Sequence, residues 1–97
     1  MNSVQLCGRV IEKPQVGQSQ KDVKFSKIRI SVERNNKDDD EQDVFEVVVF
    51  RNLAEIKLEI GQYIGVTGRL TSNCNEKDGV KYYNYSIIGT TLSLLGN

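Results

Sequence analysis

The stretch Asp43–Glu55, DVFEVVVFRNLAE, carries the residues best suited to chemistry at a protein surface. Its first half has the β-branched and aromatic residues of a strand, in which alternate side chains point to opposite faces. Glu46 and Phe50 share one face, and the charge of Glu46 marks that face as solvated. We therefore expect Phe50 to point outward, where an exposed aromatic ring can stack on a planar group such as a nucleic-acid base, with the positive charge of Arg51 beside it. Packing of Phe50 in the core or against another subunit is the alternative.

Basic residues on neighbouring strands extend this candidate surface. Lys27, Arg29 and Arg69 alternate with apolar residues, so we expect them on exposed strand faces. A solvated surface without a ligand is the alternative for each of them. Three further bases continue a cationic path: Arg51, Lys77 and Lys81. Phosphate contacts act through counterion release, and about half a dozen bases predict a moderate salt dependence.

Three tyrosines near the C-terminal end offer further aromatic rings. Tyr83, Tyr85 and Ile87 share one strand face, which we assign to the core or to an interface. Tyr82 lies on the opposite face with polar neighbours, so it is the better candidate for stacking on a base.

The charges are unevenly distributed along the chain. The formal net charge is zero, with 13 basic and 13 acidic residues, which by itself argues against a nucleic-acid binder. Six of the acids lie in the window Asp38–Glu46, which contains no base, so 13 bases face 7 acids elsewhere. We expect a mildly basic body with one solvated acidic loop. In the alternative, this loop weakens DNA binding by competition or attracts a basic partner.

Catalytic and metal-binding patterns are missing from the sequence. It has no histidine, so a Ser-His or Cys-His nucleophile pair cannot form, and it has no GxxxxGK loop. Cys7 and Cys74 match no CxxC spacing, and we expect both as reduced structural thiols. The acidic window lacks the glycine and glutamate spacing of a calcium-binding EF-hand. We therefore expect neither an enzyme nor a metal or cofactor site.

Length and hydropathy set the broad class. Ninety-seven residues predict a single domain over residues 1–97. No apolar run approaches the roughly 18–20 residues that span a bilayer, and the start of the chain lacks the features of a signal peptide. We therefore expect a cytoplasmic protein without a membrane segment.

Turn signals divide the chain into five segments with the alternation or composition of strands. These segments are Ser3–Glu12, Val23–Arg34, the first half of Asp43–Glu55, Gly61–Ser72 and Val80–Ile88. Asn52 is a candidate cap for a helix of about two turns over Leu53–Leu58. Five strands with one short helix between the third and fourth is the element order of an all-β, five-stranded OB-fold barrel. Other small barrels share this kind of spacing.

Three local details accompany these elements. Val23 and Phe25 have the wrong parity for the apolar face of the second strand, so we expect a bulge or bend near Ser26. Polar loops are expected at Asn35–Gln42 and Asn73–Gly79, the second with an Asp78-Gly79 turn. The leucines after the fifth strand, Leu92, Leu94 and Leu95, are expected to form a short packing tail.

Five blocks of the sequence, in order, resemble the bacterial single-stranded DNA-binding protein family. They are Asn2–Val10 followed by Pro14, Phe25–Val32, Val47–Glu55, Ile60–Leu70, and Asp78-Gly79 with Lys81-Tyr82 and the ending Leu92–Gly96. The resemblance implies an OB-fold that binds single-stranded DNA without sequence preference, usually as a homotetramer. It also implies that the strand Ser3–Arg9 forms contacts between subunits, giving a tetramer or dimer.

The resemblance assigns roles to some residues of the chain and not to others. Phe50 falls on a stacking aromatic, Arg51 and Arg9 on positions that are often basic, and Lys81-Tyr82 on a basic–aromatic pair. The other stacking positions of the family fall near residues that are not aromatic: Asn36, Val44 and Asn75. Bases of the family are missing near Glu46, Asn52, Ile60, Asn73 and Cys74. We therefore expect weaker binding than the fold alone implies.

Two functions remain as hypotheses. The first is sequence-independent binding of single-stranded DNA in replication, recombination or repair. The second is an OB-fold protein-interaction or primosome-type accessory module that binds nucleic acid weakly. The family's glycine-rich linker and acidic tip do not occur in the sequence, so recruitment of partners through a tail is not expected.

Overall fold

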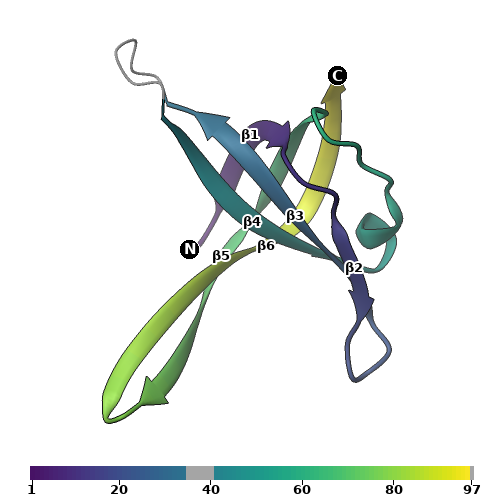
Figure 1. The fold of residues 1–97 in the computed structure, drawn as a ribbon. Coiled ribbons are helices and arrows are strands. Elements are labelled where there is room, and N and C mark those ends of the chain that lie inside the picture. Colours follow the sequence, from purple (N-terminus) through teal and green to yellow (C-terminus); the bar gives the residue numbers. More distant parts are fainter. Residues whose placement is uncertain (35–40, 97) are drawn as a thin grey trace.

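The computed structural model describes residues 1–34 and 41–96, which form a six-stranded sheet and one short 3-10 helix. The elements are β1 (Val4–Val10), β2 (Gln15–Gln18), β3 (Lys24–Glu33), β4 (Gln42–Phe50), η1 (Arg51–Glu55), β5 (Tyr63–Lys77) and β6 (Val80–Gly96) (Figure 1).

The sheet closes on itself because β1 has a partner on each side. It pairs with β5 along most of its length and with β3 at Arg9 and Val10. The ring therefore runs β1-β5-β6-β4-β3 and back to β1. All neighbours in it are antiparallel except β4 and β6, which pair in parallel at Val47 and Val48. This ring of five strands, with η1 between β4 and β5, confirms the predicted OB-fold (Figure 1).

The short strand β2 lies outside this ring and was not predicted. It pairs with β3, with Val16 opposite Ser26 and Gly17 opposite Phe25. Ser19 closes the turn between the two strands, because its hydroxyl accepts a hydrogen bond of 3.2 Å from the Val23 N–H. Only one residue of β2 is β-branched, so its strand conformation depends on pairing with β3 rather than on local propensity.

The core fills the ring with apolar side chains from every strand of the ring and from η1. Its buried members are Val10, Ile28, Ile30, Val47, Val49, Ala54, Ile64, Val66 and Ile87. Along β3 the buried Ile28 and Ile30 alternate with the exposed Lys27 and Arg29, as predicted. The outer faces of the strands are therefore the surfaces available to a ligand.

Of the bulge or bend predicted near Ser26, the bulge does not occur in β3. The register of β3 against β4 keeps one offset over its whole length, and Ser26 is a buried residue of the core-facing row. Irregular register occurs instead between β5 and β6, including the step from Thr67 to Gly68. There the β6 backbone comes so close that a Cβ on Gly68 would overlap the Ile88 carbonyl.

The segment after β4 also differs from the prediction. The 3-10 helix begins at Arg51, with Phe50 as an extended N-cap residue and no side-chain cap, so Asn52 does not cap it. Ile56 is already extended. Only Ala54 is buried, which anchors a single turn, and the half-buried Ile56 and Leu58 then follow the period of two of an extended chain.

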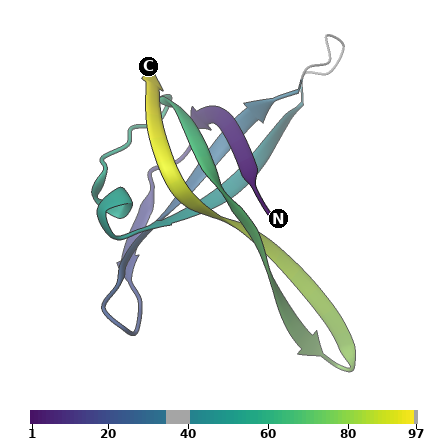
Figure 2. The same cartoon turned by 180° about the vertical axis from the view of Figure 1, so that it is seen from behind.

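The hairpin of β5 and β6 is longer than predicted. The strands continue through the expected loop to Lys77, and the turn is confined to Asp78 and Gly79, with φ of 53° and 79°. Two positive φ values favour the Asp-Gly pair of a tight hairpin turn. The predicted leucine tail is instead part of β6, which pairs up to Gly96. Residues 71–86, here called the hairpin arm, project away from the ring (Figures 1 and 2).

The close approach at Gly68 gives a prediction for stability. Gly68→Ala is expected to lower the free energy of unfolding by about 1–3 kcal/mol, because the added methyl meets backbone that cannot move aside. Gly65→Ala on the same strand is the control. A Cβ there would lie 3.4 Å from a Leu95 side-chain carbon, so a change within about 0.5 kcal/mol is expected. Urea unfolding followed by circular dichroism measures both, and equal values would contradict the argument.

Candidate nucleic-acid interface

The strand register places two of the predicted bases in one row on the outer face of the ring. Lys27 of β3 is opposite Val48 of β4, Val48 is opposite Ile88 of β6, and Ile88 is opposite Arg69 of β5. Lys27 and Arg69 are both exposed at the two ends of this row, and Val48 and Ile88 form an apolar strip between them. Neither base forms an ion pair with any residue that the structure describes. Two positive charges are therefore available on this face.

Phe50 lies at the end of β4 next to this row. Its side chain is 36% exposed and opposite Phe25, so it does not belong to the core. Arg51 follows at once, is exposed, and has a φ of 58°, which turns the chain out of the sheet. The structure thus brings Phe50, Arg51 and Lys27 to one end of β3 and β4. Their contact with a base or phosphate stays a prediction.

Arg29 is on the same face but is electrostatically compensated. Its guanidinium lies 3.4 Å from a carboxylate oxygen of Glu12 and 3.8 Å from one of Glu46. All three side chains are substantially exposed, so each pair contributes little to stability. One positive charge between two negative ones attracts a phosphate less than an unpaired base does. We therefore expect Arg29 to attract a phosphate less strongly than Lys27 or Arg69 does.

Arg9 is held at a different part of the ring. It lies opposite Tyr63 of β5, and its guanidinium is 5.4 Å from the centre of the Tyr63 ring. The same group donates a hydrogen bond of 2.8 Å to the Gly61 carbonyl. The structure does not bring Arg9 into the row of Lys27 and Arg69.

Lys81 and Tyr82, which the resemblance treats as a pair, lie on opposite faces of the hairpin arm. Tyr82 is opposite Asn75, on the face that continues from Arg69 to Lys77. Lys81 is opposite Glu76, on the other face. Tyr82 is 53% exposed. Tyr82 and Lys77 are thus the arm residues that extend the outer face of the ring.

Tyr83 and Tyr85 do not belong to the core. They are 57% and 68% exposed, while Ile87 on the same strand face is buried. The change from buried to exposed occurs where the arm leaves the ring, since Ile87 lies within the ring while Tyr83 and Tyr85 lie on the arm. The prediction that Tyr83 and Tyr85 lie in the core is therefore wrong. Their alternative placement at an interface stays a prediction.

Glu41 and Asp43 are the described acids at the start of β4, and they lie at the opposite end of β3 and β4 from Phe50. Asp38, Asp39 and Asp40 fall outside the described residues. Arg34 pairs with Asp43 at 2.9 Å and with Glu41 at 3.2 Å. Part of the acidic charge is therefore matched within the protein.

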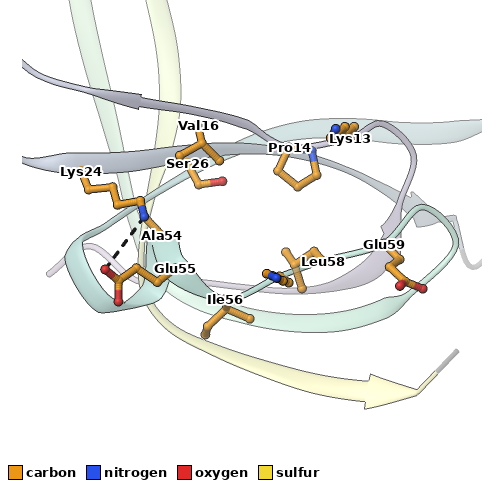
Figure 3. Close-up of a pocket in the computed structure, with 11 residues that line it drawn as sticks. Lys13, Pro14, Val16, Lys24, Ser26, Ala54, Glu55, Ile56, Leu58 and Glu59 are labelled. Carbon is orange, nitrogen blue, oxygen red and sulfur yellow. Dashed lines mark ion pairs between the residues drawn. The ribbon is translucent and has the colours of Figure 1, made fainter.

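Among the described residues, two hollows that are open to solvent are mainly apolar. The larger, of about 460 Å³, lies between Lys13–Val16 and Ala54–Glu59, and the ion pair of Lys24 with Glu55 at 3.9 Å lies at one end of it (Figure 3). The smaller, of about 370 Å³, is lined by residues of four strands: Val4, Leu6, Val44, Phe45, Glu46, Leu70, Tyr85, Ser86 and Ile87.

Metal and membrane features are not found in the described part of the chain. No three ligating side chains of histidine, cysteine, aspartate or glutamate gather there. No helix among those residues is long and apolar enough to cross a bilayer. Cys7 and Cys74 are free and both exposed, so neither is a packed structural thiol.

Comparison with known proteins agrees with this architecture. The model of the single-strand binding protein family matches residues 1–95, and the chain belongs to this family. The dimeric N-terminal domain of PriB from Thermoanaerobacter tencongensis is similar in structure, with a TM-score of 0.75 and 18% sequence identity over 99% of this chain and 98% of that one. At this identity the likeness shows the fold alone. No curated protein sequence matches the chain.

Proposed function

We propose that the protein binds single-stranded DNA without sequence preference on the outer face of β3, β4, β5 and β6, in replication, recombination or repair. The observation that carries this proposal is the row from Lys27 to Arg69 beside the exposed Phe50. It combines bases without carboxylate partners among the described residues with an aromatic ring, the combination that holds single strands. Membership of the single-strand binding protein family supports the same activity.

The proposed mode of binding uses two kinds of contact, stacking on bases and attraction of phosphates. Phe50 stacks on a base, a contact that tolerates any sequence because every base has a π-face. Lys27, Arg51 and Arg69 attract phosphates and release their counterions. Tyr82 and Lys77 extend this path along the hairpin arm. Arg29, Arg9 and Lys81 complete the set of candidate contacts, each already held near another group or facing elsewhere.

We further propose that two or four copies assemble through the strand Ser3–Arg9. Within the described residues, β1 pairs with β3 only at Arg9 and Val10, so residues 4–7 have no strand on that side. An unpaired strand edge is a ready template for another chain. Assembly through β1 would extend the sheet from one copy into the next.

A binding experiment tests the proposed activity. Fluorescent oligo-dT of increasing length, titrated at low salt, is expected to bind, and Phe50→Ala is expected to raise Kd about 5- to 150-fold, since stacking contributes about 1–3 kcal/mol per base. Val16→Ala is the control, because it removes an exposed apolar side chain that lines the larger hollow and not the face with Phe50.

Each outcome of this titration decides a different point. No binding by the wild type at low salt would reject single-strand binding and leave the OB-fold interaction module. The exposed apolar hollow beside η1 favours that second function. Binding that ignores Phe50→Ala would remove Phe50 from the site.

The compensated Arg29 gives a second prediction. Glu46→Gln removes one of its two carboxylate partners, so binding of oligo-dT at low salt is expected to tighten by about 1.5- to 5-fold, the range of an exposed ion pair. If Arg29 then contacts a phosphate, the slope of log K against log salt steepens by about 0.7. Glu55→Gln is the control. It changes the net charge by the same amount, but Glu55 pairs with Lys24, away from the row from Lys27 to Arg69. An equal effect of both variants would show that only net charge matters.

A further inference from the structure

Phe25 is an aromatic residue of the outer face that has no role so far. Its odd parity relative to Ile28 and Ile30 is the signal in the sequence, and on its own this signal predicts a bulge or bend. In the structure it occupies the outward row of β3, directly opposite Phe50 on β4. Its side chain is half-buried. Two phenylalanines are thus neighbours at the same end of the two strands.

Gly17 of β2 provides the surface on which the Phe25 ring lies. A Cβ added to Gly17 would meet the tip carbon of the ring at 2.8 Å and the two adjacent ring carbons at 3.2 and 3.3 Å. Since the three distances are similar, the ring turns its face rather than its edge toward Gly17. An edge-on ring would hold the adjacent carbons clearly farther away than the tip. One face of the ring therefore lies on β2, and the other is directed away from it.

The glycine is required by this ring and not by the backbone. Gly17 is not among the residues with positive φ, so its conformation suits any residue. The space above it is what excludes a side chain. Packing against the glycine restricts the orientation of the ring before any ligand binds. Stacking of a base on the exposed face of the ring then costs little further side-chain entropy.

A positive charge accompanies the ring. The Lys27 ammonium lies 6.0 Å from the centre of the Phe25 ring. Lys27 is also one end of the row that is proposed to attract phosphates. An aromatic surface and a mobile cation at this separation match a base and its neighbouring phosphate.

We propose that Phe25 is a second base-stacking platform, seated on Gly17 and acting beside Phe50. This inference rests on the proposed single-strand binding and adds a residue to it. Neighbouring residues across an antiparallel pair have Cα atoms about 4.5–5.5 Å apart. This exceeds the rise of about 3.4 Å per nucleotide in a stacked strand. The Phe25 ring lies over Gly17 of β2, on the other side of β3 from Phe50, so the two rings are farther apart than these Cα atoms. They therefore receive separate bases of a strand that is unstacked as it crosses β2, β3 and β4.

Substitutions at Phe25 separate stacking from mere packing on Gly17. Phe25→Leu keeps apolar volume over the glycine but has no π-face, and it is expected to raise the Kd for oligo-dT about 5- to 150-fold. Phe25→Tyr keeps the ring, and its Kd is expected to stay within about twofold of the wild type. Gly17→Ala displaces the ring without altering it and should weaken binding in the same direction. If Phe25→Leu binds like the wild type, the proposal is wrong.

A spectroscopic variant tests the contact directly, even if Phe25→Leu does not fold. The chain has no tryptophan, so Phe25→Trp introduces a single indole whose emission is expected to be quenched when a base stacks on it. The quenching should saturate at the Kd measured by anisotropy of the labelled oligonucleotide. Val16→Trp is the control. Val16 precedes Gly17 and is 59% exposed, but it points to the opposite face of β2 and lines the hollow beside η1.

The outcomes also distinguish this proposal from the proposed function. No binding of oligo-dT by the wild type rejects both. Binding by the wild type, with unquenched emission of Phe25→Trp or equal quenching of Val16→Trp, rejects the second platform and leaves single-strand binding in place. Quenching confined to Phe25→Trp supports the platform.

Discussion

The constant register between β3 and β4 is the constraint on which the exposed face depends. A slip of one residue would turn Ile28 and Ile30 outward and Lys27 into the core, because side chains alternate with a period of two. Both isoleucines are almost completely buried, so their burial holds the register. The same register sets Phe25 against Phe50. The geometry of the candidate site is thus a consequence of core packing on the other side of the same strands.

The core also determines where the site ends. Ala54 is buried and anchors η1 beneath the ring, so the chain must leave β4 directly after Phe50. Arg51 makes this turn with a φ of 58°, a conformation that costs a residue other than glycine about 1–2 kcal/mol. Packing of Ala54 offsets this cost. As a result, an aromatic and a basic side chain stand together at the exposed end of a strand.

The alternation of side chains and the turn signals predicted those parts of the structure that depend only on neighbouring residues in the sequence. Alternation was sufficient for the core rows of β3 and for the outward direction of Phe50, and the Asp78-Gly79 pair identified its turn. Strand pairing that depends on segments distant in the sequence could not be predicted in this way. β2 has little strand propensity of its own, and the extent of the hairpin arm follows from each strand supporting the other. For the same reason the parity of Phe25 predicts a bulge or bend when read from its own strand, since the position of its ring depends on Gly17 in another strand.

The distribution of charge along β3 and β4 reconciles a net charge of zero with a surface for nucleic acid. Arg34 with its acidic partners lies at one end of the two strands, Arg29 between Glu12 and Glu46 lies in the middle, and Lys27 with Arg51 lies at the other. Positive charge is thus matched within the protein at one end and open to a ligand at the end that carries the phenylalanines. Coulomb attraction between exposed groups is largely screened beyond about 10 Å at 0.1 M salt. A phosphate therefore responds to the charges near it rather than to the sum over the chain. The proposed path of a single strand therefore crosses β3 and β4 at the end with Phe25 and Phe50, not along their whole length.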